Sequence, residues 1–179
     1  MAISPAEILG LPKPAWVSDD VAMVYDTAHR FLSAEIAPRY EEFEKAECFD
    51  RESWLKAGEA GLLCASMPEE YGGSGGTFAH ESAIIEAIGH VGVEGFGIPP
   101  HNSIVAPYIL AYGSEEQKRK WLPAMARGEL IGAIAMTEPG AGSDLQGVKT
   151  RAERDGNQYR INGSKTFIPT ASSPISSSW

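Results

Sequence analysis

The sequence predicts an α+β fold, in which an N-terminal all-α helical bundle is followed by the first strands of an incomplete β domain. Three observations lead to this prediction. Apolar residues recur at helical spacing through most of residues 1–127. Beyond Gly128 the pattern changes to short apolar runs separated by tight-turn dipeptides, which is typical of strands. Residues 169–179 are rich in serine and have no periodicity, so we expect a disordered tail there.

The first helix is predicted from an apolar stripe that runs from Val21 to Ile36. Ser18 and Asp19 are both suitable N-cap residues for it. Proline has no amide proton to donate to the preceding turn, so we expect Pro38 to end this helix.

Three further helices are predicted in the same part of the chain. Asp50 is the N-cap candidate of a short helix that ends at Gly61. A second apolar run around Ile84 keeps helical spacing after a glycine-rich loop. Ser114 followed by Gln117 has the capping-box spacing and predicts the start of a third helix.

Short strands are predicted after the helical part, at residues 130–136, 149–154, 159–161 and 165–168. The dipeptide Asp155-Gly156 predicts a tight hairpin turn between the second and third of them. So few strands leave sheet edges unpaired, and for that reason we describe the β domain as incomplete. The predicted organisation is a helical domain at 1–127, the start of a β domain at 128–168, and the tail at 169–179.

Composition excludes several classes of function. The net charge of −9 argues against nucleic acid or an anionic membrane as the main partner, because both require a basic surface. The uncharged stretch 95–114 contains three prolines, so we predict no membrane span. Cys48 and Cys64 form no ligand-spaced motif, and no metal site is predicted. The N-terminus lacks the pattern of a secretory signal, and we expect a cytoplasmic location.

The segment with the clearest chemistry is residues 135–144, Ala-Met-Thr-Glu-Pro-Gly-Ala-Gly-Ser-Asp. It is a predicted strand that enters a glycine-rich turn flanked by hydroxyl groups. Gly140 and Gly142 permit positive φ and the close approach of a ligand, and consecutive amides there could form an anion-binding nest. Thr137 and Ser143 offer hydroxyl donors. On this chemistry alone, a plain turn and a cofactor site are equally good interpretations.

The string 136–144, with Gly147 after it, resembles the first signature of the flavin-dependent acyl-CoA dehydrogenases. Three other segments resemble the same family in the same order, at residues 67–75, 112–123 and 161–168. The family fold has an N-terminal helical domain, a middle β domain and a C-terminal four-helix domain. The resemblance therefore covers the first domain and the beginning of the second.

This resemblance implies FAD-dependent oxidation of an acyl-CoA thioester to the trans-2-enoyl form, in fatty-acid or branched-chain and amino-acid acyl-CoA catabolism. It also implies an electron-transferring flavoprotein as acceptor and a homo-oligomer, either a tetramer or a dimer, for the complete family member. Ser143 falls where the family contacts both the flavin and the pantetheine arm of the substrate. The full set of cofactor-binding residues that we predict is Ile134, Met136, Thr137, Gly142, Ser143, Phe167 and Ile168.

The family's catalytic base is a glutamate of the C-terminal domain or its neighbouring helices, and no position here corresponds to it. We therefore assign no catalytic residue and expect this chain to be inactive alone. Glu138 could act as a base, but a carboxylate beside a proline turn more often fixes loop geometry, and the four histidines are interpreted as surface or capping residues.

The family commonly has serine or threonine where Pro169 stands, and we hypothesise that the reading frame is shifted from this residue onward. Two alternatives remain open. One is a non-catalytic fragment that binds acyl-CoA or a family partner. The other is an acyl-CoA oxidase or flavin monooxygenase of the same fold.

Overall fold

The structure is a computed structural model that describes residues 14–168. The chain divides into two compact units, Met1–Gly132 and Ala133–Trp179, which we call the helical unit and the loop–hairpin unit. Each is described by itself. The predicted tail at 169–179 and the hypothesis of a shifted frame concern residues outside the described part, and the predicted domain limits stay predictions.

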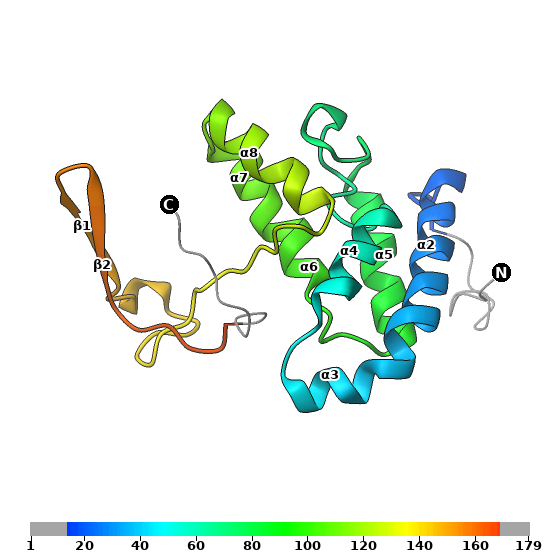
Figure 1. The fold of residues 1–179 in the computed structure, drawn as a ribbon, viewed down its shortest axis with the longest axis horizontal. Helices are drawn as coiled ribbons and strands as arrows, with labels where there is room; N and C mark the ends of the chain where they lie inside the picture. The colour runs from blue at the N-terminus through cyan, green and yellow to red at the C-terminus, as the bar shows by residue number, and fades with distance from the viewer. Residues whose placement is uncertain (1–13, 169–179) are drawn as a thin grey trace. The chain divides into compact units, whose positions relative to one another are not determined.

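In the helical unit, α2 and α5 lie side by side (Figure 1). No helix within residues 14–168 is both long and apolar enough to cross a membrane. Within residues 14–132, the α-helices of the unit are α2 (Asp19–Phe31), α3 (Tyr40–Ala46), α4 (Arg51–Glu59), α5 (Phe78–Val91), α6 (Ile98–Pro100), α7 (Ala106–Tyr112) and α8 (Glu115–Ala126).

The capping residues predicted for α4 and α8 are confirmed. The Asp50 carboxylate accepts a hydrogen bond from the Ser53 amide at 2.8 Å, which satisfies one of the free amides of the first turn. At α8, the Ser114 hydroxyl accepts from the Gln117 amide while the Gln117 side chain accepts from the Ser114 amide.

The prediction that Pro38 ends the first helix is wrong. After α2 the chain continues through a π-helical turn, Leu32–Ile36, and a 3-10 turn, Ala37–Arg39, directly into α3. Pro38 lies in the first positions of the 3-10 turn, where the fixed φ of proline is compatible with helical geometry. The proline therefore changes the helical geometry without ending the helical path.

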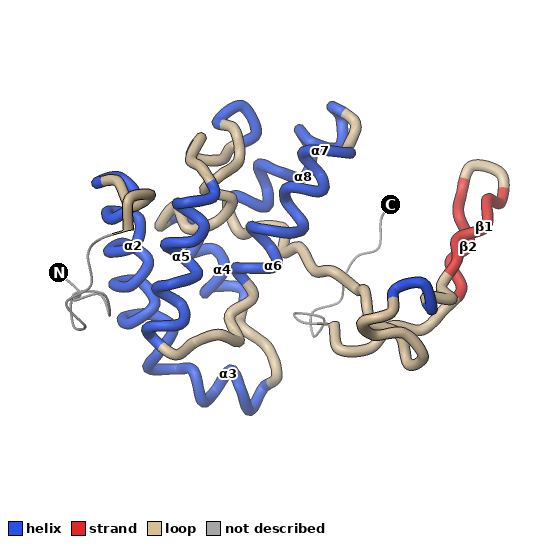
Figure 2. The backbone as a smooth tube through the Cα atoms, turned by 180° about the vertical axis from the view of Figure 1, so that it is seen from behind, coloured by secondary structure: helices blue, strands red, loops and turns tan. Residues whose placement is uncertain are grey.

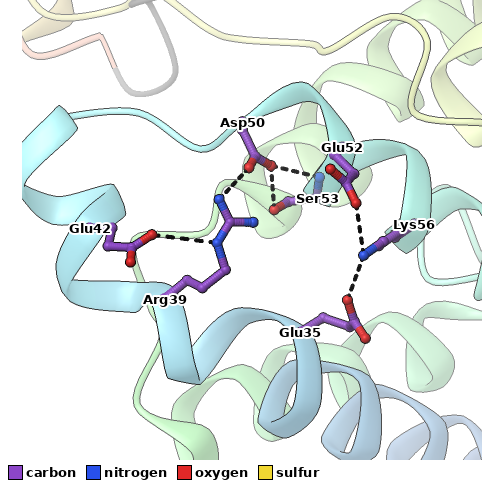
Figure 3. A network of polar contacts seen from close by, with 7 residues as sticks. All are labelled: Glu35, Arg39, Glu42, Asp50, Glu52, Ser53 and Lys56. Carbon is purple, nitrogen blue, oxygen red and sulfur yellow. Dashed lines mark hydrogen bonds and ion pairs between the residues drawn. The ribbon is translucent and has the colours of Figure 1, made fainter.

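A polar network links this irregular segment to the start of α4 (Figure 3). The Arg39 guanidinium pairs with Asp50 at 2.7 Å, and the Lys56 ammonium pairs with Glu35 at 2.8 Å. All four side chains are partly exposed, and exposed ion pairs contribute about 1 kcal/mol or less. We infer that these pairs orient α4 more than they stabilise it.

The core of the helical unit is apolar, with a small polar network inside it. The Asn102 amide group donates to the Leu62 carbonyl and to the Glu81 carboxylate, each at 2.8 Å, and its oxygen accepts from the Cys64 amide at 3.0 Å. Glu81 also accepts from the Ser66 amide at 2.8 Å. These bonds provide partners for backbone amides and a carbonyl of the loop after α4. The largest fully buried apolar side chains are Trp54, Phe96, Leu32, Ile36, Leu62, Leu63, Ile84, Ile98, Leu122 and Met125.

His101 is fully buried, so its interpretation as a surface or capping residue is wrong. Its Nδ1 accepts a hydrogen bond from the Gly132 amide at 2.9 Å, and Nε2 lies 3.3 Å from the Met125 carbonyl. An accepting Nδ1 leaves the proton on Nε2, which donates to Met125. Burial lowers the pKa of His101 to about 4, so the ring is neutral at physiological pH.

Between residues 133 and 168, the loop–hairpin unit contains one antiparallel pair of strands, β1 (Arg151–Asp155) and β2 (Gln158–Asn162), shown in red in Figure 2. Residues 156 and 157 form the turn, and Gly156 has a φ of +62°, which glycine adopts without strain. The hairpin predicted from Asp155-Gly156 is confirmed. Both strands are exposed along their length.

The strands predicted at 130–136 and 165–168 do not form in the described chain. The second segment makes one backbone bond, from the Thr166 amide to the Thr137 carbonyl at 2.9 Å. An extended segment becomes part of a sheet only when a neighbouring strand pairs with its amides and carbonyls. Within residues 14–168 such a ladder exists only between β1 and β2.

Candidate functional site

The glycine-rich loop begins with a tight four-residue turn. The Glu138 amide donates to the Ala141 carbonyl at 2.9 Å, and the Ala141 amide returns a bond to the Glu138 carbonyl at 3.1 Å. Pro139 and Gly140 occupy the central positions, where turns favour these residue types. The turn is therefore formed by hydrogen bonds between its own residues and does not depend on a neighbouring strand.

Neither of the two glycines that we expected to form an anion nest has a positive φ. The alternating backbone conformation of such a nest is therefore not present at Gly140 or Gly142. A β-carbon at either residue would meet no protein atom within 4 Å, so packing within the chain does not require glycine here. Glycine at these positions leaves the backbone open to the close approach of a ligand.

Glu138 lies at the centre of the loop and is only 7% exposed. Its carboxylate accepts from the Lys149 amide at 2.7 Å and from the Thr150 amide at 3.0 Å, and it pairs with the Lys165 ammonium at 2.9 Å. Hydrogen bonds from Thr150, Lys149 and Lys165 lower the pKa of this carboxyl to about 2. Three donors engage its carboxylate oxygens, which agrees with the expectation that Glu138 fixes loop geometry.

The structure brings two of the predicted cofactor-binding segments together. The Thr166 amide donates to the Thr137 carbonyl, and the Lys165 ammonium donates to the Met136 carbonyl at 3.0 Å. Ile134, Met136 and Thr137 therefore lie on a segment that is hydrogen-bonded to the one carrying Phe167 and Ile168. Gly142 and Ser143 lie further along the loop and are exposed, and within the described chain no hydrogen bond joins them to residues 165–168.

The side chains of this cluster fit a flat, aromatic cofactor with a polar edge. Phe167 is 91% exposed and Met136 is 47% exposed, so both present apolar surface outward. Phe167 also has a φ of +55°, and a bulky residue holds this strained conformation mainly at functional sites. The hydroxyl groups of Thr137 and Ser143 make no hydrogen bond to the residues that the structure describes. Hydroxyl groups beside apolar surface are the chemistry that we predicted for the cofactor-binding residues of this loop.

Sequence reasoning did not identify Lys165 as part of this site. The available signal was the Glu138 carboxylate itself, because a shielded carboxylate is usually paired with a cation, and Lys165 is one of the few basic residues that follow it in the sequence. Lys149 and Thr150 contribute backbone amides, and no side-chain pattern could have revealed them.

Two family models match consecutive parts of the chain. The first, described as the acyl-CoA dehydrogenase N-terminal domain, matches residues 18–129. The second, described as the acyl-CoA dehydrogenase middle domain, matches residues 133–176.

Among relatives, the mitochondrial long-chain specific acyl-CoA dehydrogenase of Sus scrofa is 47% identical over 143 residues, 80% of this chain and 33% of the relative. A crystal structure of an acyl-CoA dehydrogenase from Geobacillus kaustophilus is 46% identical with a TM-score of 0.82, covering 87% of this chain and 41% of that one. The Bacillus anthracis acyl-CoA dehydrogenase complexed with FAD is 38% identical with a TM-score of 0.79, covering 88% of this chain and 28% of that one.

The chain thus spans about a third of the length of the curated relative and less than half of either solved structure. Helices α2 to α8 and the glycine-rich loop fall within the matched parts. The chain therefore belongs to the acyl-CoA dehydrogenase family, of which it carries the N-terminal domain and part of the middle domain.

Proposed function

We propose that this chain contributes the flavin-contacting loop to an FAD-dependent oxidation of an acyl-CoA thioester to its trans-2-enoyl form. The observation that carries the proposal is the cluster formed by the hydrogen-bonded segments 134–137 and 165–168, in which Phe167 is exposed and has a positive φ. Membership of the family supports the reaction class.

Each residue of the cluster has a defined task in this proposal. Met136, Phe167 and the partly buried Ile134 provide apolar contacts to the ring, and the Thr137 hydroxyl donates to its polar edge. Ser143 lies on the exposed part of the loop and can contact both the cofactor and the substrate arm. When bound, the flavin supplies the two-electron oxidation by accepting the β hydride, and the residues of the chain bind and orient the flavin.

No residue of this cluster serves as the base that removes the α proton, because the one buried carboxylate is fully engaged. We therefore expect FAD binding without turnover from this chain alone. The proposal also includes an electron-transferring flavoprotein as acceptor and a homo-oligomeric assembly. For the location we propose the cytoplasm, although the relative from Sus scrofa is named as mitochondrial.

A titration of the full chain with FAD, followed by flavin fluorescence, tests this function. Thr137→Val keeps the shape of the side chain and removes the hydroxyl, so the affinity should fall by about three- to tenfold, the value of one hydrogen bond. Thr27→Val, which makes the same change on α2, should leave the affinity unchanged. The absence of FAD binding by the unsubstituted chain would favour the alternative of a non-catalytic fragment that binds no flavin.

A further inference from the structure

Three contacts converge on the Glu138 carboxylate, and they come from two separate stretches of chain. The Lys149 and Thr150 amides approach it from the segment that leads into β1, at 2.7 and 3.0 Å. The Lys165 ammonium approaches it from the segment that follows β2, at 2.9 Å. One side chain thus ties the start of the glycine-rich loop to both ends of the hairpin.

Lys165 adds a second tie between the same segments. Its ammonium donates to the Met136 carbonyl at 3.0 Å while it pairs with Glu138, and the neighbouring Thr166 amide donates to the Thr137 carbonyl at 2.9 Å. Its side chain is 22% exposed and that of Glu138 is 6% exposed, so the pair is largely shielded from water. A shielded pair holds its geometry better than an exposed one, and losing one partner leaves the other charge uncompensated.

The pair lies next to the apolar surface without forming part of it. Glu138 and Lys165 both point into the loop, whereas Met136 and Phe167 present their side chains to solvent. The carboxylate is ionised throughout the physiological range because its pKa lies near 2, and its oxygens already accept from three donors of the chain. Its contribution to a bound ligand must therefore act through the residues that it holds.

We propose that Glu138 and Lys165 are positioning residues for the flavin, whose ion pair fixes the Met136–Thr137 backbone against the segment that presents Phe167. This inference rests on the proposed function. The pair sets the spacing between the two ring-contacting segments before the cofactor binds, which reduces the ordering that binding requires. Both side chains are largely shielded from solvent, so the proposal assigns neither of them a contact with the ring.

The experiment compares FAD affinity of the full chain with that of Lys165→Met, Lys165→Arg and Glu138→Gln. Methionine keeps the stem of the lysine and removes its charge, so the affinity should fall by about tenfold or more. Arginine can still pair with the carboxylate and donate to the Met136 carbonyl, and it should restore most of the affinity. Glu153→Gln is the matched control, because Glu153 forms an exposed ion pair with Arg151 and should change the affinity less than about twofold.

Amide hydrogen exchange on the same variants reports whether the pair acts through the loop. In Glu138→Gln, one of the two carboxylate oxygens becomes an amino group that cannot accept a bond, so the Lys149 or Thr150 amide should exchange faster. Combining Glu138→Gln with Lys165→Met should cost less affinity than the sum of the two single losses, since either substitution removes the shared ion pair.

The outcomes separate this inference from the function on which it rests. Equal affinities for the unsubstituted chain and Lys165→Met, or an equal loss in Lys165→Met and Lys165→Arg, would overturn the positioning role while leaving flavin binding intact. No FAD binding by the unsubstituted chain would overturn the proposed function and the positioning role together.

Discussion

At the scale of single residues, His101 makes the helical unit sensitive to acid. Its pKa is lowered to about 4 in the folded chain, against 6.5 for an unperturbed histidine. Between these values the unfolded chain binds the extra proton and the folded chain does not, so the free energy of unfolding falls as the pH decreases from about 6.5 to about 4. The full effect is at most about 3 kcal/mol. Cys64, at 3.8 Å from Nε2, has a pKa raised to about 12 by burial and by the nearby Glu81, and does not titrate in this range.

Urea denaturation followed by circular dichroism at several pH values checks this prediction. His101→Gln keeps an acceptor and a donor but carries no titrating group, so the slope of stability against pH should become shallower in that range. Thr27→Val on α2, which leaves every titrating group in place, should retain the original slope. Identical slopes for His101→Gln and the unsubstituted chain would show that this histidine does not titrate on unfolding.

The residue scale is also where sequence reasoning is least complete. Apolar spacing identified the buried face around Ile84 but could not show that Glu81, one helical turn earlier, is buried as well. Its burial depends on Asn102 and on the Ser66 amide, which only the folded chain brings close. The role of Glu138 was foreseeable because its turn is local, whereas its partner Lys165 was not.

At the scale of elements, the N-cap of α4 has a measurable share in stability. Asp50→Ala removes the acceptor for the Ser53 amide and the partner of Arg39, and should lower the free energy of unfolding by about 1–2 kcal/mol. Asp50→Asn keeps a capping oxygen and removes only the charge, so we expect a smaller loss, below about 1 kcal/mol.

Urea midpoints of the two variants, compared with the unsubstituted chain, provide the measurement. Equal losses for alanine and asparagine would mean that the ion pair, and not the cap, is the stabilising contact. No loss for alanine would contradict the capping role altogether.

The elements that sequence predicted correctly are those whose signals are local. The caps of α4 and α8 and the turn at Asp155-Gly156 each depend on a few consecutive residues, and all three are confirmed. The strand at 130–136 needed a partner strand, which an apolar run cannot supply by itself. Pro38 was misread because its effect depends on its position within a helical turn, which sequence spacing did not reveal.

At the scale of the whole molecule, we expect the chain to associate. Tyr159 and Ile161 lie on the same face of β2 and are 67% and 64% exposed, and Phe167 adds further apolar surface. A net charge of −9 opposes association only weakly at physiological salt. We predict soluble aggregates or a poorly defined oligomer, with strong binding of a hydrophobic dye.

Light scattering and dye fluorescence on the purified chain test this expectation. Tyr159→Thr combined with Ile161→Thr keeps the strand propensity of β2 and removes its apolar face, so both signals should fall. A monodisperse monomer with no dye binding before substitution would show that this face is covered.

The central claim is that residues 134–143 and 165–168 contact a flavin. Hydrogen–deuterium exchange of the full chain, recorded with and without FAD and resolved along the sequence, tests it most directly, because it locates the ligand without requiring turnover. We predict slower exchange in these two segments on addition of FAD, with α2, α4 and α5 unchanged. Unaltered exchange in both segments at the highest FAD concentration, or protection confined to the helical unit, would contradict the account.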